Sequence, residues 1–148
     1  MKLILIFTIV LFGTAGLAGA QAVQKNKPAS DGQSVRSSAA FSEVIFRRAE
    51  LEAELESLLL EFTEEYPKVR ADRYSIAQLQ KQIEVLLSTK PGDSARLTLA
   101  LGKLMVKKVE LETDLWALQQ SLADGHPDVK RAKRKLEIFE KAIKDILG

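Results

Sequence analysis

The chain has 148 residues, of which 46% are apolar, 22 are lysine or arginine and 20 are aspartate or glutamate. It contains one histidine and no cysteine, which excludes disulfides, thiol chemistry and cysteine-ligated metal sites. The charge is close to balanced, so net charge alone gives no indication of nucleic-acid binding.

Residues 1–22, "MKLILIFTIVLFGTAGLAGAQA", combine a lysine, an apolar run from Leu3 to Phe12 and a stretch of small residues. This pattern predicts a secretory signal peptide that is cleaved after residue 20 or 22. The apolar run is well short of the roughly 20 residues that span a bilayer, and an uncleaved anchor is the alternative. We therefore expect a periplasmic or secreted protein with no stable membrane insertion after cleavage.

Residues 23–40 are mostly polar, contain proline, glycine and several serines, and show no periodic apolar positions. Such a composition is typical of a chain that cannot bury enough apolar surface to order itself. We expect a flexible linker between the signal peptide and a helical domain over residues 41–148.

The helical domain consists of two repeats, 41–88 and 101–148, which align without a gap at an offset of 60 residues. Ten aligned positions are identical: Glu50/Glu110, Leu51/Leu111, Glu52/Glu112, Leu55/Leu115, Leu58/Leu118, Pro67/Pro127, Val69/Val129, Lys81/Lys141, Ile83/Ile143 and Leu87/Leu147. Leucines of two amphipathic helices align by chance, but a proline and its neighbours rarely do. The alignment therefore indicates an internal duplication.

Apolar residues in both repeats recur mainly at three- and four-residue steps, the period of an amphipathic helix. In the first repeat they are Phe41, Val44, Leu51, Leu55, Leu58 and Phe62, then Val69, Ile76, Leu79, Ile83 and Leu86. In the second they are Leu101, Leu104, Leu111, Leu115, Leu118 and Leu122, then Val129, Ala132, Leu136, Phe139, Ile143 and Ile146. This pattern predicts an all-α fold, a duplicated antiparallel coiled-coil helical hairpin. Its helices are expected over about 42–65, 67–88, 95–124 and 127–147.

The predicted hairpin turns are the segments "EEYPKV" and "DGHPDV", which place Tyr66 and His126 before Pro67 and Pro127. Proline suits the first turn of a helix and disrupts its interior, so each proline should begin a new helix. Val69 and Val129 follow in the new helices, and Gly125 could close the preceding helix in the left-handed conformation. At Pro67 the apolar period runs through the proline, so a kinked continuous helix is the alternative there.

The segment "STKPGDS" at 88–94 predicts a loop, with Asp93 or Ser94 available to cap the following helix. The helices on either side differ in charge. Residues 43–65 hold eight acidic and two basic side chains, whereas 67–90 and 126–147 each carry a net charge of +3. An acidic first helix beside basic ones favours the antiparallel pairing of the hairpins.

The seam of each hairpin uses only some of the apolar residues of its helices, and the remaining ones need a second surface to bury them. The candidate interaction surface is formed by Ile45, Phe46, Leu59, Leu60, Val106 and Trp116. Either the two hairpins pack into a four-helix bundle, or chains associate through this face, or the face binds an apolar client.

No motif in the chain carries recognisable chemistry. His126 is the only histidine, so neither a metal site nor a catalytic residue is predicted, and no cofactor is expected. Tyr66 occupies the equivalent position, which favours a packing role for both rings. We expect a non-enzymatic protein.

A basic run lies at the start of the last predicted helix, formed by Lys130, Arg131, Lys133, Arg134 and Lys135. It is either a solvated helix face or a surface for an anionic envelope polymer. No aromatic residues are interleaved with these charges, so no nucleic-acid partner is expected.

The paired helices and turns resemble the periplasmic coiled-coil segment of polysaccharide co-polymerases, the chain-length determinant and exopolysaccharide transport family. The residues that carry this resemblance are Leu115, Leu118, His126, Pro127, Asp128, Val129, Leu136 and Ile143, echoed by Tyr66, Pro67 and Val69. The resemblance covers the hairpins without the membrane and kinase parts of that family. It implies two antiparallel helices joined by the His-Pro-acidic-Val turn, and an accessory role in polysaccharide export.

Together these features predict an exported coiled-coil protein that serves as a structural or protein–protein interaction module of the cell envelope. Its partner would be another protein or a second copy, engaged through helix faces. The alternative function is a small periplasmic holdase-like chaperone with an apolar client face.

Overall fold

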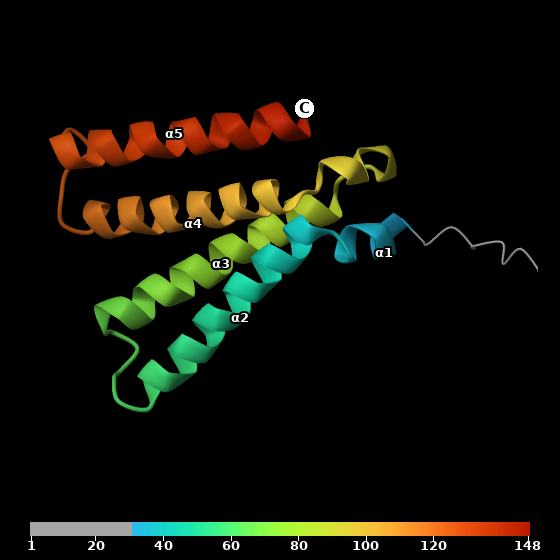
Figure 1. Ribbon diagram of the computed structural model, residues 1–148. Coiled ribbons are helices and arrows are strands. Elements are labelled where there is room, and N and C mark those ends of the chain that lie inside the picture. Colours follow the sequence, from blue (N-terminus) through green and yellow to red (C-terminus); the bar gives the residue numbers. More distant parts are fainter. Residues whose placement is uncertain (1–30) are drawn as a thin grey trace, which may run out of the picture.

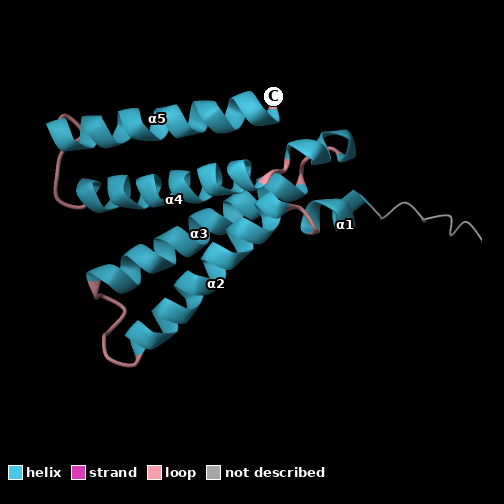
Figure 2. Cartoon of the chain, in the orientation of Figure 1, coloured by secondary structure: helices cyan, strands magenta, loops and turns pink. Residues whose placement is uncertain are grey.

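The computed structural model describes residues 31–148, and in this part of the chain all regular structure is helical (Figures 1 and 2). The elements are α1 (Asp31–Arg36), α2 (Ala39–Leu59), α3 (Pro67–Leu87), the short 3-10 helix η1 (Pro91–Arg96), α4 (Leu99–Gln119) and α5 (Pro127–Leu147). The all-α fold is therefore confirmed. The predicted signal peptide and the first part of the predicted linker lie outside the described residues.

The four long helices form two antiparallel hairpins of closely matching design. Each helix has 21 residues, which corresponds to about 32 Å. Every helix of the second hairpin begins and ends 60 residues after its equivalent in the first, as expected for a duplicated unit.

The repeat also begins earlier than the sequence alignment suggested. The short helices α1 and η1 precede their hairpins at the same offset of 60 residues. Their sequences share Gly32/Gly92, Ser34/Ser94 and Arg36/Arg96. The repeat unit thus includes a short helix before each hairpin. This part is too short and too polar for an apolar period to reveal it.

The prediction of a flexible linker is wrong for residues 31–40. Asp31–Arg36 are helical, and Val35 is only 2% exposed in the core formed with Leu97 and the long helices. The chain is anchored here because one apolar side chain in a polar stretch finds a buried site. A single side chain has no periodicity, so the sequence pattern did not signal it.

Both prolines begin a new helix, which confirms the predicted turns and rules out a kinked continuous helix at Pro67. α2 ends at Leu59 and α3 starts at Pro67; α4 ends at Gln119 and α5 starts at Pro127. The predicted helix ends at 65 and 124 were too late by six and five residues. Both helices stop before the proline, and the intervening residues form the turn.

Gly125 does not close α4 in the left-handed conformation. Among the described glycines only Gly148 has a positive φ. The C-cap of α4 is instead Gln120, which keeps a right-handed conformation, and the Leu122 amide donates to the Leu118 carbonyl at 2.9 Å. The turn at 120–126 therefore does not depend on the conformational freedom of glycine.

Side-chain caps start the first helix of each hairpin at equivalent positions. The Ser38 hydroxyl accepts a hydrogen bond from the Phe41 amide at 3.2 Å, and the Thr98 hydroxyl accepts one from the Leu101 amide at 3.3 Å. Thr98 therefore takes the role expected of Asp93 or Ser94, because η1 occupies that part of the predicted loop.

The helices form an open arrangement centred on α4. α4 packs along α2 and α3 and also contacts α5, whereas α5 packs mainly against α4, with fewer contacts to η1 (Figure 1). The main core lies between α2, α3 and α4, where Val44, Leu79, Leu86, Leu101 and Met105 are fully buried. The seam of the second hairpin is less buried, because α5 has one long neighbour instead of two. α4 of the second hairpin thus makes the contact with the first hairpin. The four long helices do not close into a symmetric four-helix bundle.

The hairpins meet most closely where α2 passes α4 at Gly102. A Cβ atom at Gly102 would lie 2.8 Å from the Glu43 Cβ and 2.9 Å from the Ala40 Cα. The Ala40 amide also donates to the Leu97 carbonyl at 3.2 Å, which ties the start of α2 to the segment before α4. A residue without a side chain is therefore required at this crossing.

We expect Gly102→Ala to lower the free energy of unfolding by about 1–2 kcal/mol. In an isolated helix this change would stabilise by about 1 kcal/mol, but here the added methyl group forces α2 and α4 apart. Urea unfolding followed by circular dichroism measures the change.

Gly125→Ala serves as the control, because a Cβ atom there meets nothing within 4 Å. It should change the stability by less than about 0.5 kcal/mol. Stabilisation by Gly102→Ala would show that the two helices do not cross as closely as described.

Candidate interaction surfaces

The turn of the first hairpin exposes a small apolar group. Leu60 is 87% exposed, and the rings of Phe62 and Tyr66 stack with centroids 4.1 Å apart while each side chain remains 38% exposed. We call Leu60, Phe62 and Tyr66 the first tip. Three neighbouring apolar side chains at the end of a hairpin form a ready contact for another molecule.

An ion pair closes each turn at equivalent positions. The Arg73 Nε donates to the Glu64 carboxylate at 2.7 Å, and the Lys133 Nζ donates to the Asp124 carboxylate at 3.0 Å. Hydrogen bonds from Gln119 and Lys133 hold the pKa of Asp124 below its usual value. These pairs were missed from the sequence, although an acidic residue at 64 and 124 and a basic one at 73 and 133 could have signalled them.

The turn of the second hairpin is more polar, with Gln120, Leu122 and His126 at the positions of the first-tip residues. The Nδ1 atom of His126 accepts a hydrogen bond from the Asp128 amide at 3.2 Å and so caps α5. Tyr66 makes no such cap and instead stacks on Phe62. Tyr66 therefore packs against another ring, whereas His126 caps a helix. The expected common packing role of the two rings is wrong.

The valine two residues after each proline anchors the backbone of both turns. Val69 and Val129 are both completely buried, at 0% exposure. Each lies two residues inside its helix and so fixes the direction in which the new helix leaves the turn. The predicted turn residues thus fall into a buried anchor and an exposed tip.

The two hairpins also touch near their turns, between α3 and α4. Tyr74 and Trp116 stack with centroids 5.0 Å apart, and the Arg70 guanidinium lies 5.6 Å from the centroid of the Trp116 ring. Arg70 also donates to the Gln120 side chain at 3.3 Å. The hydroxyls of Ser75 and Thr113 are 2.7 Å apart. We call this set the distal contact.

Tyr74 lies in a partly dehydrated position within the distal contact. Burial raises the pKa of its phenol, and the negative charge of Glu112 raises it further. The phenol is therefore held in its neutral form, which suits a stacking residue.

The six residues of the predicted interaction surface do not form one face. Ile45 and Val106 pack against the core, Trp116 belongs to the distal contact, and Leu59 is partly buried. Phe46 on α2 and Leu60 directly after the end of α2 remain exposed, at 63% and 87%. The division arises because α4 has neighbours on several sides, whereas the outer side of α2 has none in the described chain.

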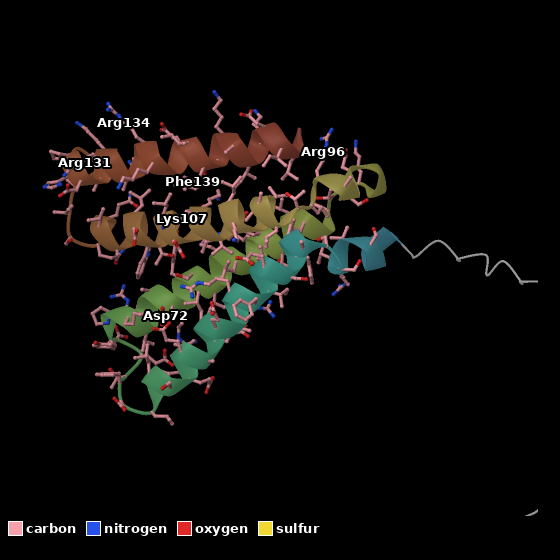
Figure 3. The ribbon with its side chains drawn as sticks, in the orientation of Figure 1. Asp72, Arg96, Lys107, Arg131, Arg134 and Phe139 are labelled. Atoms are coloured by element: carbon pink, nitrogen blue, oxygen red, sulfur yellow. The ribbon has the colours of Figure 1, made fainter. Side chains whose placement is uncertain are left out.

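The predicted basic surface lies on α5 and divides into paired and unpaired side chains. Arg131 pairs with Asp128, which lowers the Asp128 pKa, and Lys133 pairs with Asp124. Within residues 31–148, Lys130, Arg134 and Lys135 are exposed and have no ion pair. Figure 3 shows Arg134 extending from α5 on the side away from α4.

Asp72 is a buried carboxylate that the sequence analysis did not single out. It is 3% exposed, accepts a hydrogen bond from the Lys68 Nζ at 2.5 Å, and leaves its Oδ2 atom without a hydrogen-bond partner. Lys68 also pairs with Glu54 at 2.9 Å. Burial by itself would lower the pKa of Lys68, but the hydrogen bonds to Asp72 and Glu54 outweigh it and raise the pKa. The lysine thus neutralises a buried charge at the start of α3.

The described residues offer shallow surfaces rather than an enclosed site. A pocket of about 200 Å³ lies beside the distal contact, lined by Pro67, Arg70, Trp116, Ala117 and Gln120. Among residues 31–148 no group of three or more His, Cys, Asp or Glu side chains is placed to hold a metal ion. None of the described helices is long and apolar enough to cross a membrane.

We expect Lys68→Met to lower the free energy of unfolding by about 1–3 kcal/mol, because it leaves the buried Asp72 charge without a cation. The raised pKa means that Lys68 contributes fully below pH 10.5 and loses its contribution as the pH rises through the folded-state value. The difference between variant and parent in urea unfolding should therefore shrink at high pH.

The paired variant Asp72→Ala should change the stability by less than about 1 kcal/mol, because it removes the buried charge itself. The second hairpin already holds Ala132 at the equivalent position. Equal destabilisation by both changes would indicate that the carboxylate, rather than its neutralisation, stabilises the fold.

No protein-family model, curated protein or solved structure matches this chain.

Proposed function

We propose that this protein is a non-enzymatic, exported helical module that binds another protein of the cell envelope through the first tip. The observation that carries the proposal is the exposure of Leu60 at 87% next to the stacked rings of Phe62 and Tyr66. When a partner covers water-exposed apolar side chains at the end of a hairpin, the free energy of the system falls, which favours binding.

The second hairpin supports this proposal, because it makes the same turn without exposing the same apolar group. Its tip carries Gln120 and His126 where the first has Leu60 and Tyr66. Both turns are closed by an equivalent ion pair and begin a helix at proline. The apolar residues of the first tip are therefore not needed to form the turn, which leaves binding as a reason for them.

A non-enzymatic role is supported by the state of the few groups that could do chemistry. His126, the only histidine, uses its Nδ1 atom to cap α5. Asp72, the buried carboxylate, is neutralised by Lys68. Both groups serve the fold.

Export is supported by the sequence of residues 1–22, which has the order of charged, apolar and small residues found in signal peptides. Mass spectrometry of the protein recovered from its native host should give a chain that begins after residue 20 or 22. Recovery of the uncleaved chain would contradict this part of the proposal.

A role beside the polysaccharide export machinery is one form that this function could take. The resemblance noted in the sequence rests on the segment from His126 to Val129, and this segment does join two antiparallel helices. The envelope partner would then be a component of that machinery.

A holdase-like chaperone is the alternative, and the exposed side chains Phe46 and Leu60 are the observation that favours it. Phe46 lies on α2 and Leu60 directly after its end, and the exposed Glu50, Glu52, Glu54 and Glu56 between them interrupt an apolar client surface. A specific contact at the tip therefore fits the distribution of charges better.

The test is a site-specific photo-crosslink from position 65, an exposed residue of the first turn, in cells of the native host. We expect one discrete adduct with an envelope protein. The exchange Leu60→Gln, Phe62→Leu and Tyr66→His, which copies the second tip, should abolish the adduct with little loss of stability. Leu99→Gln changes an exposed leucine outside the tip and should leave the adduct intact.

Absence of any discrete adduct, or its survival in the exchange variant, would contradict the proposed function. Suppression of aggregation of an unfolded outer-membrane protein, lost in the same variant, would instead establish the chaperone.

A further inference from the structure

Two long helix faces have no neighbour within the described chain, one on each outer helix. α2 exposes Phe46 and Ala53, and α5 exposes Arg134 and Ile138. α2 and α5 lie at opposite edges of the molecule (Figure 1), so these faces cannot cover one another within one chain.

The exposed face of α5 is equivalent, in the repeat, to the face of α3 that contacts α4. At the offset of 60 residues, the α3 residues of the distal contact correspond to residues of α5: Arg70 to Lys130, Tyr74 to Arg134 and Ser75 to Lys135. In α3 this face packs on α4. In α5 it faces solvent.

The exposed face of α2 is likewise the equivalent of the α4 face that receives α3. Thr113 and Trp116 of the distal contact correspond to Ala53 and Glu56. The buried Val109, 2% exposed, corresponds to the exposed Ala49. The outer helices therefore carry the repeat equivalents of both sides of the α3–α4 contact. These two faces lie on opposite edges of the molecule, and neither has a partner in the described chain.

We infer that copies of this chain associate head to tail, with the outer face of α5 docked on the outer face of α2 of a second copy. The docked helices would run antiparallel, as α3 and α4 do. Repeat proteins stack in this way, since each unit offers its neighbour the contact it receives from the unit before.

The charges at the equivalent positions favour this docking. The contact of Arg70 and Tyr74 with Trp116 becomes a contact of Lys130 and Arg134 with Glu56 of the next copy. In the described residues these three side chains are exposed and have no ion pair. Two cations would therefore meet one carboxylate, and all three gain a partner that the single chain does not provide.

The same docking would bury exposed apolar side chains. Ile138 is 67% exposed on the α5 face, one helical turn from Arg134, and the facing α2 positions include the small residues Ala49 and Ala53. The small side chains leave room for the isoleucine. Burial of Ile138 adds an apolar component to the ionic contact.

The close crossing of α2 and α4 at Gly102 is not available between copies, because Ser42 stands at the equivalent position. The contact between copies is therefore confined to the half of the helices near the turns, where the charges lie. Association that depends on exposed ion pairs weakens as salt screens them.

Because the two faces differ, the interface is heterologous and each added copy leaves one face of each kind open. Such contacts generate rings or open chains. This inference goes beyond the proposed function, because it uses the faces of α2 and α5 and leaves the stacked rings of the first tip free.

Sedimentation velocity of the purified mature chain tests the inference. The sedimentation coefficient should rise with protein concentration, and less so at high salt. Glu56→Lys, and separately the double change Lys130→Glu and Arg134→Glu, should each weaken association at least about tenfold. An equimolar mixture of the two variants should restore it, because each retains the face that the other lacks.

Glu65→Lys, and separately the double change Lys81→Glu and Lys90→Glu, are matched controls with the same charge changes at exposed positions outside both faces, and they should leave association unchanged. Circular dichroism verifies that all variants are folded. A parent chain that stays monomeric at every concentration would overturn the inference. So would a face variant that still associates alone, since that indicates contact between identical faces. The first-tip exchange should still associate, which separates this inference from the proposed function.

Discussion

The fold depends on a steric constraint at two equivalent positions. Proline lacks an amide hydrogen and its ring clashes with the preceding turn of a helix, so Pro67 and Pro127 are favoured at the start of a helix and disfavoured inside one. Each is followed two residues later by a completely buried valine, and each turn is closed by an ion pair. The steric constraint stops the first helix, and the anchor and the ion pair direct the second one back along it.

The two hairpins have the same backbone plan but unequal surroundings. α4 lies against α2, α3 and α5, whereas α5 packs mainly against α4. The same repeat position is therefore buried in one hairpin and exposed in the other, as Val109 and Ala49 show. The residues follow this difference. Where α3 presents Tyr74 to Trp116, α5 presents Arg134 to solvent, and where α4 has Trp116, α2 has Glu56.

This difference between equivalent residues determines which charges lie on the outer helices. Most residues of the distal contact are aromatic or neutral and stack or share hydrogen bonds, and the one charged member, Arg70, lies against the Trp116 ring. On α5 the equivalents of the α3 residues are all basic, and on α2 the equivalent of Trp116 is the acidic Glu56. A surface charge costs little in water, whereas an unpaired charge between helices is expensive. The duplicated unit thus holds itself together inside and presents opposite charges at its two edges.

By itself, the sequence determined the helical class, the duplication and both reversals, because the apolar period and the two prolines act locally. It did not determine the helix ends before each turn, since the caps at Leu60 and Gln120 form from ordinary right-handed residues with no signature. Nor did it place α1, where a single side chain, Val35, provides the anchor. Only the tertiary structure decided which apolar residues are buried between hairpins and which remain exposed. Trp116 and Phe46 were both expected on one interaction surface, and they differ because α3 lies beside α4 while no part of the described chain covers the outer side of α2.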